Sequence, residues 1–244
     1  MSETTPDTLP KRFLLEASLE EVAAMLPAIG RAMVGISGGG TTHERIGVIA
    51  AAPCTAETLR IQGEQHDSEL ALARVVRVIG DRSSTMRGKS YPRFEFKDAA
   101  DVTLMSVTAM DGAELYDEAV RAHVGTVLES PPRPDLPPTD QQPEADAGNA
   151  ALEALRDSGG QVEIGFGEAG ARQVWRGQVE EVKGVMGYAN IIRPDFHLHL
   201  RGGSVTGFRR TEAGLAALDA QGAETGLVLR PLDAAAEAAL ASFG

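Results

Sequence analysis

Two stretches of this chain match each other: residues 94–100, FEFKDAA, and residues 215–221, LAALDAQ. In each, apolar residues precede an Asp-Ala turn, which is typical of a β-hairpin. A second pair also aligns, ELALAR at 69–74 and FHLHLR at 196–201, with Leu70 on Leu198. These matches predict an internal duplication, in which two halves of the chain have similar folds.

Residues 130–149 separate the two halves. Six of the 13 prolines fall here, at positions 131, 132, 134, 137, 138 and 143, and no aromatic residue does. Such a stretch cannot bury enough apolar surface to fold and behaves as a stiff linker. We therefore expect an N-terminal lobe at 1–129, a proline-rich linker at 130–149 and a C-terminal lobe at 150–244.

Each lobe reads as several strands, a hairpin and a closing helix. Before the linker, the pattern predicts a helix capped at Ser18 by a capping box, strands at 45–52 and within 69–79, a hairpin over 93–108 and a helix at 111–129. After it, we expect a helix at 150–157, strands at 162–166, 173–177, 189–192 and 196–200, a hairpin turn at 219–222 and a helix at 233–242. Long helices do not separate the strands. The fold class is therefore α+β, with two similar lobes of antiparallel β-sheet and flanking helices.

Composition narrows the classes of function. The 244 residues carry a net charge of −12, which argues against nucleic acid or an anionic membrane as the main partner. One cysteine, Cys54, excludes an internal disulfide and a cysteine-only zinc site. No apolar run approaches the ~20 residues that span a bilayer, and the N-terminus is polar, so we expect a cytoplasmic protein without membrane insertion.

Two glycine motifs match known functional motifs, one for dinucleotide binding and one for a catalytic serine, but each has a simpler structural explanation. Residues 165–170, GFGEAG, fit the dinucleotide fingerprint GxGxxG, but a strand pattern follows where a helix is needed, which favours a hairpin turn. Residues 35–39, GISGG, fit the nucleophile elbow of a serine hydrolase around Ser37. Because consecutive glycines start helices poorly, a loop is the better interpretation, and the hydrolase stays a third hypothesis.

His197 and His199 lie two residues apart, so both imidazoles project from one face of a strand. Two such nitrogens can hold a metal, although no nearby Cys or Glu has convincing spacing for a third ligand. A histidine pair on a half-buried strand is the simpler reading. Seven arginines of the C-terminal lobe, at 172, 176, 193, 201, 209, 210 and 230, could include an anion site or be ordinary surface charge.

Three runs resemble the C-terminal repeat of the bacterial hemin-degrading, haem-utilisation family of the HemS/ChuX type. They are residues 167–183, GEAGARQVWRGQVEEVK, residues 186–192, MGYANII, and residues 194–200, PDFHLHL. The hairpin at 215–222 is similar to the family's as well. The N-terminal lobe resembles the first repeat at 43–48 and 94–98, and the likeness covers most of 40–120 and 160–230.

The resemblance implies a two-repeat α+β protein of the cytoplasm that binds hemin and hands it on, with haem degradation as the activity that some members have. Haem importers or haem oxygenases would then be partners in iron acquisition and transport. The matching positions imply His199 as an axial ligand to haem iron, which is also the one metal ligand we assign, with His43, Arg230 and Arg209 as further haem contacts. An apolar slot, an imidazole and cations for the propionates are what haem requires.

The sequence also departs from the family. The family's axial histidine on a helix between the repeats has no counterpart in residues 130–157, and its first-repeat arginine falls on Ala71. The alternative hypothesis is therefore a degenerate relative that binds no haem and has a structural or regulatory partner.

Overall fold

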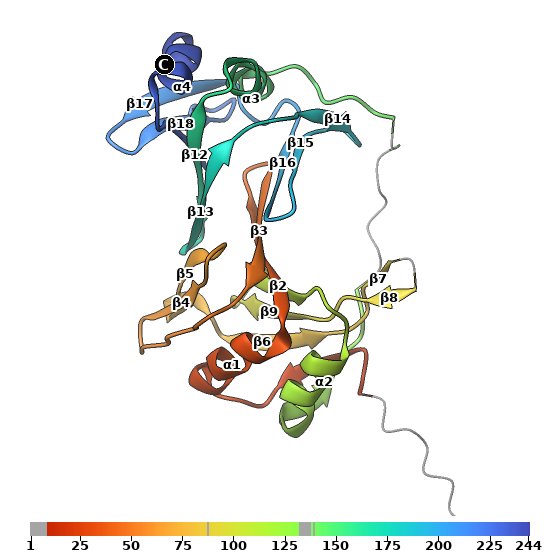
Figure 1. The fold of residues 1–244 in the computed structure, drawn as a ribbon. Helices are drawn as coiled ribbons and strands as arrows, with labels where there is room; N and C mark the ends of the chain where they lie inside the picture. Colours follow the sequence, from red (N-terminus) through yellow and green to blue (C-terminus); the bar gives the residue numbers. More distant parts are fainter. Residues whose placement is uncertain (1–8, 87, 132–137, 139) are drawn as a thin grey trace, which may run out of the picture.

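The chain forms two layers of antiparallel sheet with helices at both ends. A computed structural model describes residues 9–86, 88–131, 138 and 140–244 (Figure 1). The N-terminal half contains β1 (Arg12–Leu15), α1 (Leu19–Met25), β2 (Arg31–Gly38), β3 (Thr41–Val48), β4 (Thr58–Gln62), β5 (Asp67–Ala71), β6 (Arg77–Asp81), β7 (Thr85–Met86), β8 (Lys89–Ser90), β9 (Arg93–Lys97), β10 (Thr103–Ala109), α2 (Glu114–Val120) and β11 (Val124–Val127). The C-terminal half contains α3 (Ala147–Ser158), β12 (Gln161–Glu168), β13 (Ala171–Gln178), β14 (Lys183–Val185), β15 (Tyr188–Ile192), β16 (Phe196–Arg201), β17 (Gly207–Thr211), β18 (Gly214–Leu218), β19 (Glu224–Pro231) and α4 (Ala234–Leu240).

The two large sheets exchange strands between the halves. The ten-stranded sheet has the order β11-β1-β6-β9-β10-β2-β3-β16-β15-β14, and the seven-stranded sheet has the order β17-β18-β19-β12-β13-β5-β4. The N-terminal order β6-β9-β10-β2-β3 therefore recurs as β17-β18-β19-β12-β13. In each sheet the last of these strands pairs antiparallel with a strand of the other half, β3 with β16 and β13 with β5. The predicted antiparallel α+β class is confirmed.

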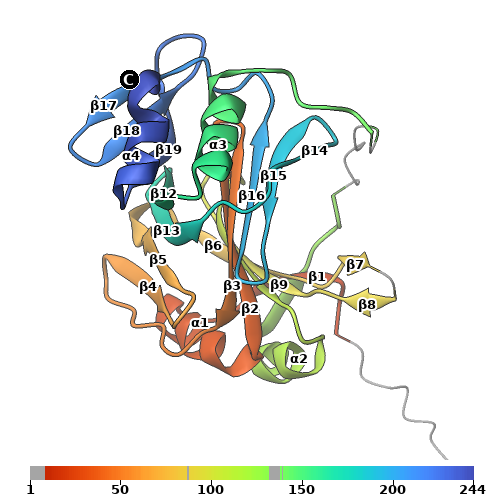
Figure 2. The same ribbon diagram turned by 45° about the horizontal axis from the view of Figure 1, so that its top comes forward.

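One face of the ten-stranded sheet is covered along its length. Tyr116 of α2 packs on Phe94 of β9 with ring centroids 4.8 Å apart. In the middle, the seven-stranded sheet covers β2 and β3, and Gln173 of β13 donates from Nε2 to the carbonyl of His43 at 2.6 Å. At the other end α3 lies close to β16, since a β-carbon at Gly148 would lie 2.7 Å from Leu200 (Figure 2). The opposite face of this sheet carries mostly polar side chains.

Local capping explains where the helices begin. Ser18 accepts from the backbone N–H of Glu21, whose carboxylate accepts in return from the N–H of Ser18, so the predicted capping box is confirmed. Asp146 and Asp233 accept from the N–H groups of Asn149 and Ala236 and begin α3 and α4 in the same way. None of the helices in the described ranges is long and apolar enough to cross a membrane.

Three predicted elements differ from the structure. The helix expected at 111–129 is α2 followed by one 3-10 turn, and Val124 and Val127 belong to β11, which pairs with β1. β-Branched residues with a glycine between them favour an edge strand over a further helical turn. The strand expected within 69–79 is divided between β5 and β6, which lie in different sheets. The strand expected at 45–52 begins earlier, at Thr41, and ends at Val48.

Both glycine motifs lie in hairpins. Residues 165–170 form the end of β12 and its turn into β13, as the hairpin interpretation predicts. Ser37 lies within β2, where its hydroxyl pairs with that of Thr42 at 2.9 Å. The chain then turns through Gly39 and Gly40, with φ of 52° and 80°, into β3. A strand follows Ser37 where a nucleophile elbow requires a helix, so the hydrolase hypothesis lacks its structural basis.

Candidate functional site

The candidate site lies where β3 of the N-terminal half meets β16 of the C-terminal half. Side chains of β16 alternate: Phe196, Leu198 and Leu200 are fully buried against the core, whereas His197 and His199 are half-buried on the opposite face. The antiparallel register places His197 opposite Glu44 and His199 opposite Thr42. Glu44 therefore shares the outer face of the sheet with both histidines.

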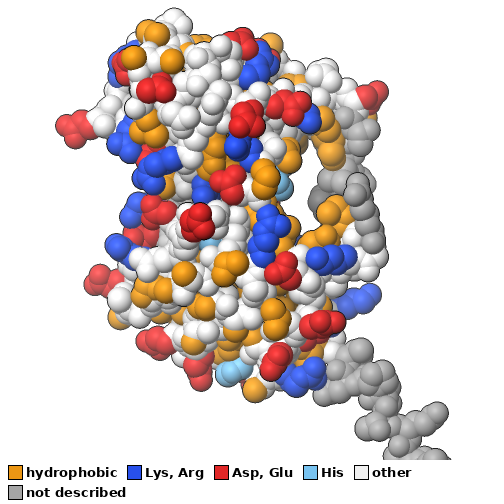
Figure 3. Space-filling view, viewed as in Figure 1, with side chains coloured by type: hydrophobic (Ala, Val, Ile, Leu, Met, Phe, Trp, Pro, Cys, Tyr) orange, Lys and Arg blue, Asp and Glu red, His pale blue; other side chains and the backbone are white. Residues whose placement is uncertain are grey.

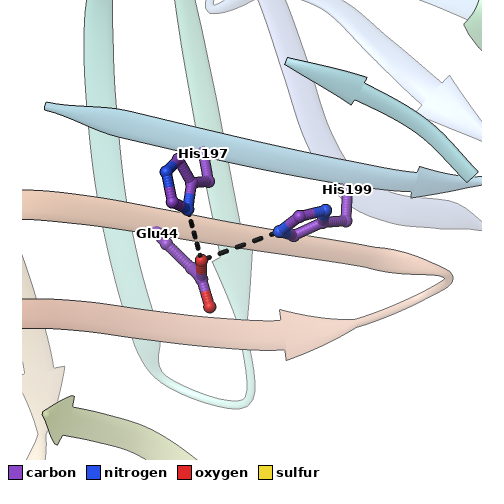
Figure 4. A group of neighbouring side chains, drawn as sticks. All are labelled: Glu44, His197 and His199. Atoms are coloured by element: carbon purple, nitrogen blue, oxygen red, sulfur yellow. Dashed lines mark hydrogen bonds and ion pairs between the residues drawn. The ribbon is translucent and has the colours of Figure 1, made fainter. Parts of the chain in front are cut away.

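Glu44, His197 and His199 form a compact cluster (Figure 4). Oε2 of Glu44 lies 3.1 Å from Nδ1 of His197 and 3.7 Å from Nε2 of His199. One ligand atom from each of the three side chains lies within 4.8 Å of the other two. The sequence indicated the histidine pair but not the third member, because Glu44 is 153 residues from His197 along the chain.

Asn190 of β15 fixes the protonation pattern of His199. Its Nδ2 faces the backbone carbonyls of Lys183, Val185 and Tyr188 at 2.9 to 3.2 Å, so this end of the amide is the donor. Oδ1 then faces Nδ1 of His199 at 2.6 Å and can only accept. When the imidazole of His199 is neutral, its proton is therefore on Nδ1. Its Nε2, which faces Glu44, donates to that carboxylate only when it carries a second proton.

Glu44 is held as a carboxylate. Burial of its side chain acts to raise its pKa, but the hydrogen bonds from His197 and His199 outweigh burial and lower the pKa to about 2. The site therefore keeps a negative charge beside two imidazoles throughout the physiological pH range. Such a carboxylate can bind protonated imidazole or a metal cation.

Apolar and cationic side chains surround His199 on this face. Ile192 and Tyr188 of β15 and Val185 of β14 share the face through the registers of β14, β15 and β16. Ile192 is 53% exposed and Val185 is 37% exposed. Arg201 lies two residues beyond His199 on the same strand face, and among the described residues its guanidinium makes no ion pair.

His43, a predicted haem contact, is part of the core. It is fully buried between the two sheets, where Nε2 donates to the carbonyl of Ile164 at 3.1 Å and the ring packs on Phe196 at 4.8 Å. Burial lowers its pKa to about 3, so the imidazole is neutral. Its Nδ1 has no partner among the described residues. His43 lies beside Glu44 in sequence but on the opposite face of β3.

Arg230 and Arg209 lie in the other sheet. Arg230 of β19 forms a two-pronged ion pair with Glu163, at 2.9 and 2.7 Å, and Arg209 of β17 pairs with Glu224. Positive and negative side chains are intermixed on the side of the molecule that Figure 3 shows. The structure therefore does not bring the four predicted haem contacts together, and His199 alone lies on the outer face of the ten-stranded sheet.

A charged cluster occupies the same outer face further along the sheet. Asp81 of β6 is 1% exposed, and its carboxylate forms ion pairs with the guanidinium groups of Arg12 at 2.8 Å and Arg93 at 2.7 Å. Glu95 of β9 pairs with the same two arginines and with Lys97. These cations are neutralised within the cluster. Arg201, beside His199, has no ion pair among the described residues and is open to an anionic ligand.

Solved structures with a similar fold are haem-degrading and haem-binding proteins. The structure is similar to that of the heme degrading enzyme ChuS of Escherichia coli O157:H7, with a TM-score of 0.75 and 19% identity over 96% of this chain and 87% of that chain. A second structure of ChuS, described as an E. coli heme oxygenase, has a TM-score of 0.74 and 18% identity over 96% of this chain and 89% of that chain. Holo-PhuS, a heme-binding protein from Pseudomonas aeruginosa, has a TM-score of 0.72 and 18% identity over 96% of this chain and 87% of that chain.

No protein-family model matches the sequence, and neither does any curated protein sequence. At 18 to 19% identity the likeness to ChuS and PhuS concerns the fold. It extends over nearly the whole chain and includes both halves. The resemblance to the hemin-degrading family that the sequence motifs predict is thereby confirmed at the level of the fold: this chain has the antiparallel α+β fold of ChuS and PhuS.

Proposed function

We propose that this protein binds hemin and transfers it, as a haem-utilisation protein of the cytoplasm. The observation that carries the proposal is His199, whose imidazole lies half-buried on the outer face of the ten-stranded sheet in the fold that ChuS and PhuS share. Its Nδ1 is hydrogen-bonded to Asn190, and its Nε2, 3.7 Å from Glu44, is the nitrogen that the iron would take. Hemin is the substrate or cargo in this proposal. A neutral imidazole whose other nitrogen is hydrogen-bonded is the usual protein ligand of haem iron.

The neighbours of His199 suit the rest of the porphyrin. Val185, Tyr188 and Ile192 offer partly exposed apolar surface on the two adjacent strands. Arg201 offers a guanidinium without an ion pair in the described part of the chain, and guanidinium groups bind carboxylates such as the propionates. We therefore propose Arg201 as the propionate contact, in place of Arg230 and Arg209, which the sequence suggested as haem contacts.

Titration of the purified protein with hemin tests this function. The wild-type protein should shift the Soret band at one equivalent, and His199→Ala should weaken binding by at least about tenfold. His123→Ala, which changes a histidine remote from the sheet face, is the matched control and should leave the shift unchanged. A shift that survives both His199→Ala and His43→Ala would exclude these histidines as ligands, and no shift at all would remove haem binding.

The finer question is whether hemin is degraded. Adding a reductant in air to the hemin complex and following the Soret band over time answers it. We expect the band to persist, because the axial histidine between the repeats and the first-repeat arginine of the hemin-degrading family are both missing from this sequence. Loss of the band with release of iron would show turnover and overturn this expectation.

A partner role without haem is the second candidate function. It is favoured by the dispersal of the predicted contacts, with His43 in the core and Arg230 and Arg209 in ion pairs of the other sheet. Saturable, stoichiometric hemin binding at sub-micromolar concentration would count against it. Retention of an unrelated protein by the hemin-free chain, with no Soret shift, would favour it.

A further inference from the structure

We propose that Glu44, His197 and His199 form a mononuclear site for a divalent first-row transition-metal ion, a function separate from haem binding. The three side chains supply two imidazole nitrogens and one carboxylate oxygen from two adjacent strands. This donor set suits Zn²⁺, Fe²⁺, Co²⁺ or Ni²⁺, whereas Mg²⁺ and Ca²⁺ prefer oxygen ligands alone.

The spacing of the donor atoms is close to that of a metal site. Ligands about 2.0 to 2.2 Å from a tetrahedral metal lie roughly 3.3 to 3.6 Å from one another. The two distances from Oε2 of Glu44 are 3.1 Å to His197 and 3.7 Å to His199. All three donor atoms lie within 4.8 Å of one another, so in this proposal side-chain rotation brings the donors to the shorter spacing that one shared ion requires.

The surroundings hold these donors in place. Phe196 and Leu198, the neighbours of the histidines on β16, are fully buried, so the backbone that carries both imidazoles is anchored in the core. Asn190 holds the proton of His199 on Nδ1 and so leaves Nε2 as the ligand atom. A hydrogen bond of this kind to the nitrogen remote from the metal is typical of histidine ligands.

Electrostatics favour a cation between the three groups. The carboxylate Oε2 of Glu44 lies 3.1 Å from Nδ1 of His197 and 3.7 Å from Nε2 of His199, so its negative charge attracts a cation placed between the three groups. All three side chains are also partly exposed, so the one remaining position of a tetrahedral ion, or the three of an octahedral ion, stays open to water or a small ligand.

The two functions share His199 but differ at His197. His199 serves both hemin and the metal ion, so the two ligands should compete. Glu44 and His197 are ligands in the metal proposal only, because the haem proposal assigns His199 as its one ligand. Variants of Glu44 and His197 therefore separate failure of the metal proposal from failure of the haem proposal.

Direct metal binding to the tag-free, hemin-free protein tests the proposal. Co²⁺ should give visible d–d absorption bands at one equivalent, and Zn²⁺ should displace it with a stoichiometry of one by calorimetry. Glu44→Gln and His197→Ala should each weaken Zn²⁺ binding by at least about tenfold, and a Soret titration of the same variants measures hemin binding separately. Glu163→Gln, in the other sheet, is the matched control and should bind Zn²⁺ as the wild type does.

Two outcomes would overturn the site. One is wild-type protein that binds neither ion at millimolar concentration, which would show that the three side chains form a hydrogen-bonded cluster only. The other is Zn²⁺ binding that survives both Glu44→Gln and His197→Ala. Circular dichroism of each variant establishes that it is folded, and His197→Gln provides a second, polar replacement if His197→Ala is not.

Discussion

Glu44 and His197 lie opposite each other across the junction of the two halves, with 3.1 Å between the carboxylate Oε2 and the imidazole Nδ1. This contact exists because β3 and β16 are neighbours in one sheet although 153 residues separate the pair. The second sheet has the corresponding junction, between β13 and β5. Each half thus completes a sheet of the other, and the outer face at the first junction carries the candidate site.

Unfolding should be a single cooperative transition. Because both large sheets contain strands from both halves, neither half can lose its strands without breaking a sheet of the other. Trp175, the only tryptophan, lies in β13 of the C-terminal half, so its fluorescence reports on the unfolding of that region. Far-ultraviolet circular dichroism reports on the secondary structure of the whole chain. The two urea curves should coincide. Separate midpoints would show that the halves unfold independently.

Phe196→Ala should be among the most destabilising single changes. The ring is fully buried, stacks on Trp175 at 4.5 Å and packs on His43 at 4.8 Å, so it links the two sheets at their junction. Truncation of such a ring costs about 3 to 5 kcal/mol of unfolding free energy. Phe208→Ala provides the comparison, because Phe208 is half-buried on the edge strand β17. Urea denaturation should show a clearly smaller loss for Phe208→Ala, and equal losses would contradict the central role of Phe196.

His43→Gln should make the protein less sensitive to acid. The unfolded chain protonates this histidine near its ordinary pKa of about 6.5, whereas burial lowers the folded pKa to about 3. The unfolded state therefore binds the extra proton first. Stability from neutral His43 is full above about pH 6.5 and is lost as the pH falls toward 3, by about 1.4 kcal/mol per pH unit at most.

Glutamine is a suitable replacement because its amide can donate to the carbonyl of Ile164 without titrating. Gln173 occupies the corresponding position of the other hairpin, since the β2–β3 register pairs Ile36 with His43 and the β12–β13 register pairs Phe166 with Gln173. Urea denaturation of both proteins between pH 5 and pH 7 measures the difference. An unchanged pH slope in His43→Gln would show that His43 does not account for the acid sensitivity.

Short-range patterns predicted the elements of the fold well, and the pairing between halves poorly. The capping box at Ser18 and the hairpin turns at 98–101 and 219–222 depend on residues a few positions apart, and all are confirmed. Val124 and Val127 fit both a helical face and an edge strand, and only β1 decides between them. Local sequence therefore predicts an element best where one pattern excludes the others.

The candidate site shows the same limit. The alternation in β16 predicted that His197 and His199 share a face, but Glu44 joins them only through the register of β3 and β16. That register depends on packing of the whole sandwich. His43 is a further case, because a polar residue in a strand gives no sign that a second sheet will cover it. The sequence thus indicated two of the three members of the cluster, and it assigned to haem a residue, His43, that belongs to the core.

Arg230→Ala and Arg209→Ala should have little effect on hemin binding. Both arginines form exposed ion pairs in the seven-stranded sheet, so the loss of either should change stability by less than about 1 kcal/mol. If hemin binds at His199, the affinity should change by less than about twofold. Arg201→Ala, on the same strand face as His199, should weaken binding clearly in the same Soret titration. The reverse pattern would place hemin on the other sheet.

Asn190→Leu should impair the metal site without removing a ligand. The change takes away the oxygen that accepts from Nδ1 of His199, so the imidazole proton can move to Nε2, the proposed ligand atom. Zn²⁺ affinity should fall about 10- to 100-fold, as is usual when such a partner is lost. Nitrogen-15 NMR of the histidine side chains should show the Nδ1–H form of His199 in the wild type and a mixture in the variant. Loss of the three carbonyl contacts should destabilise the fold as well, but destabilisation alone leaves the tautomer unchanged. Weaker Zn²⁺ binding with an unaltered tautomer would therefore show that Asn190 acts only through stability.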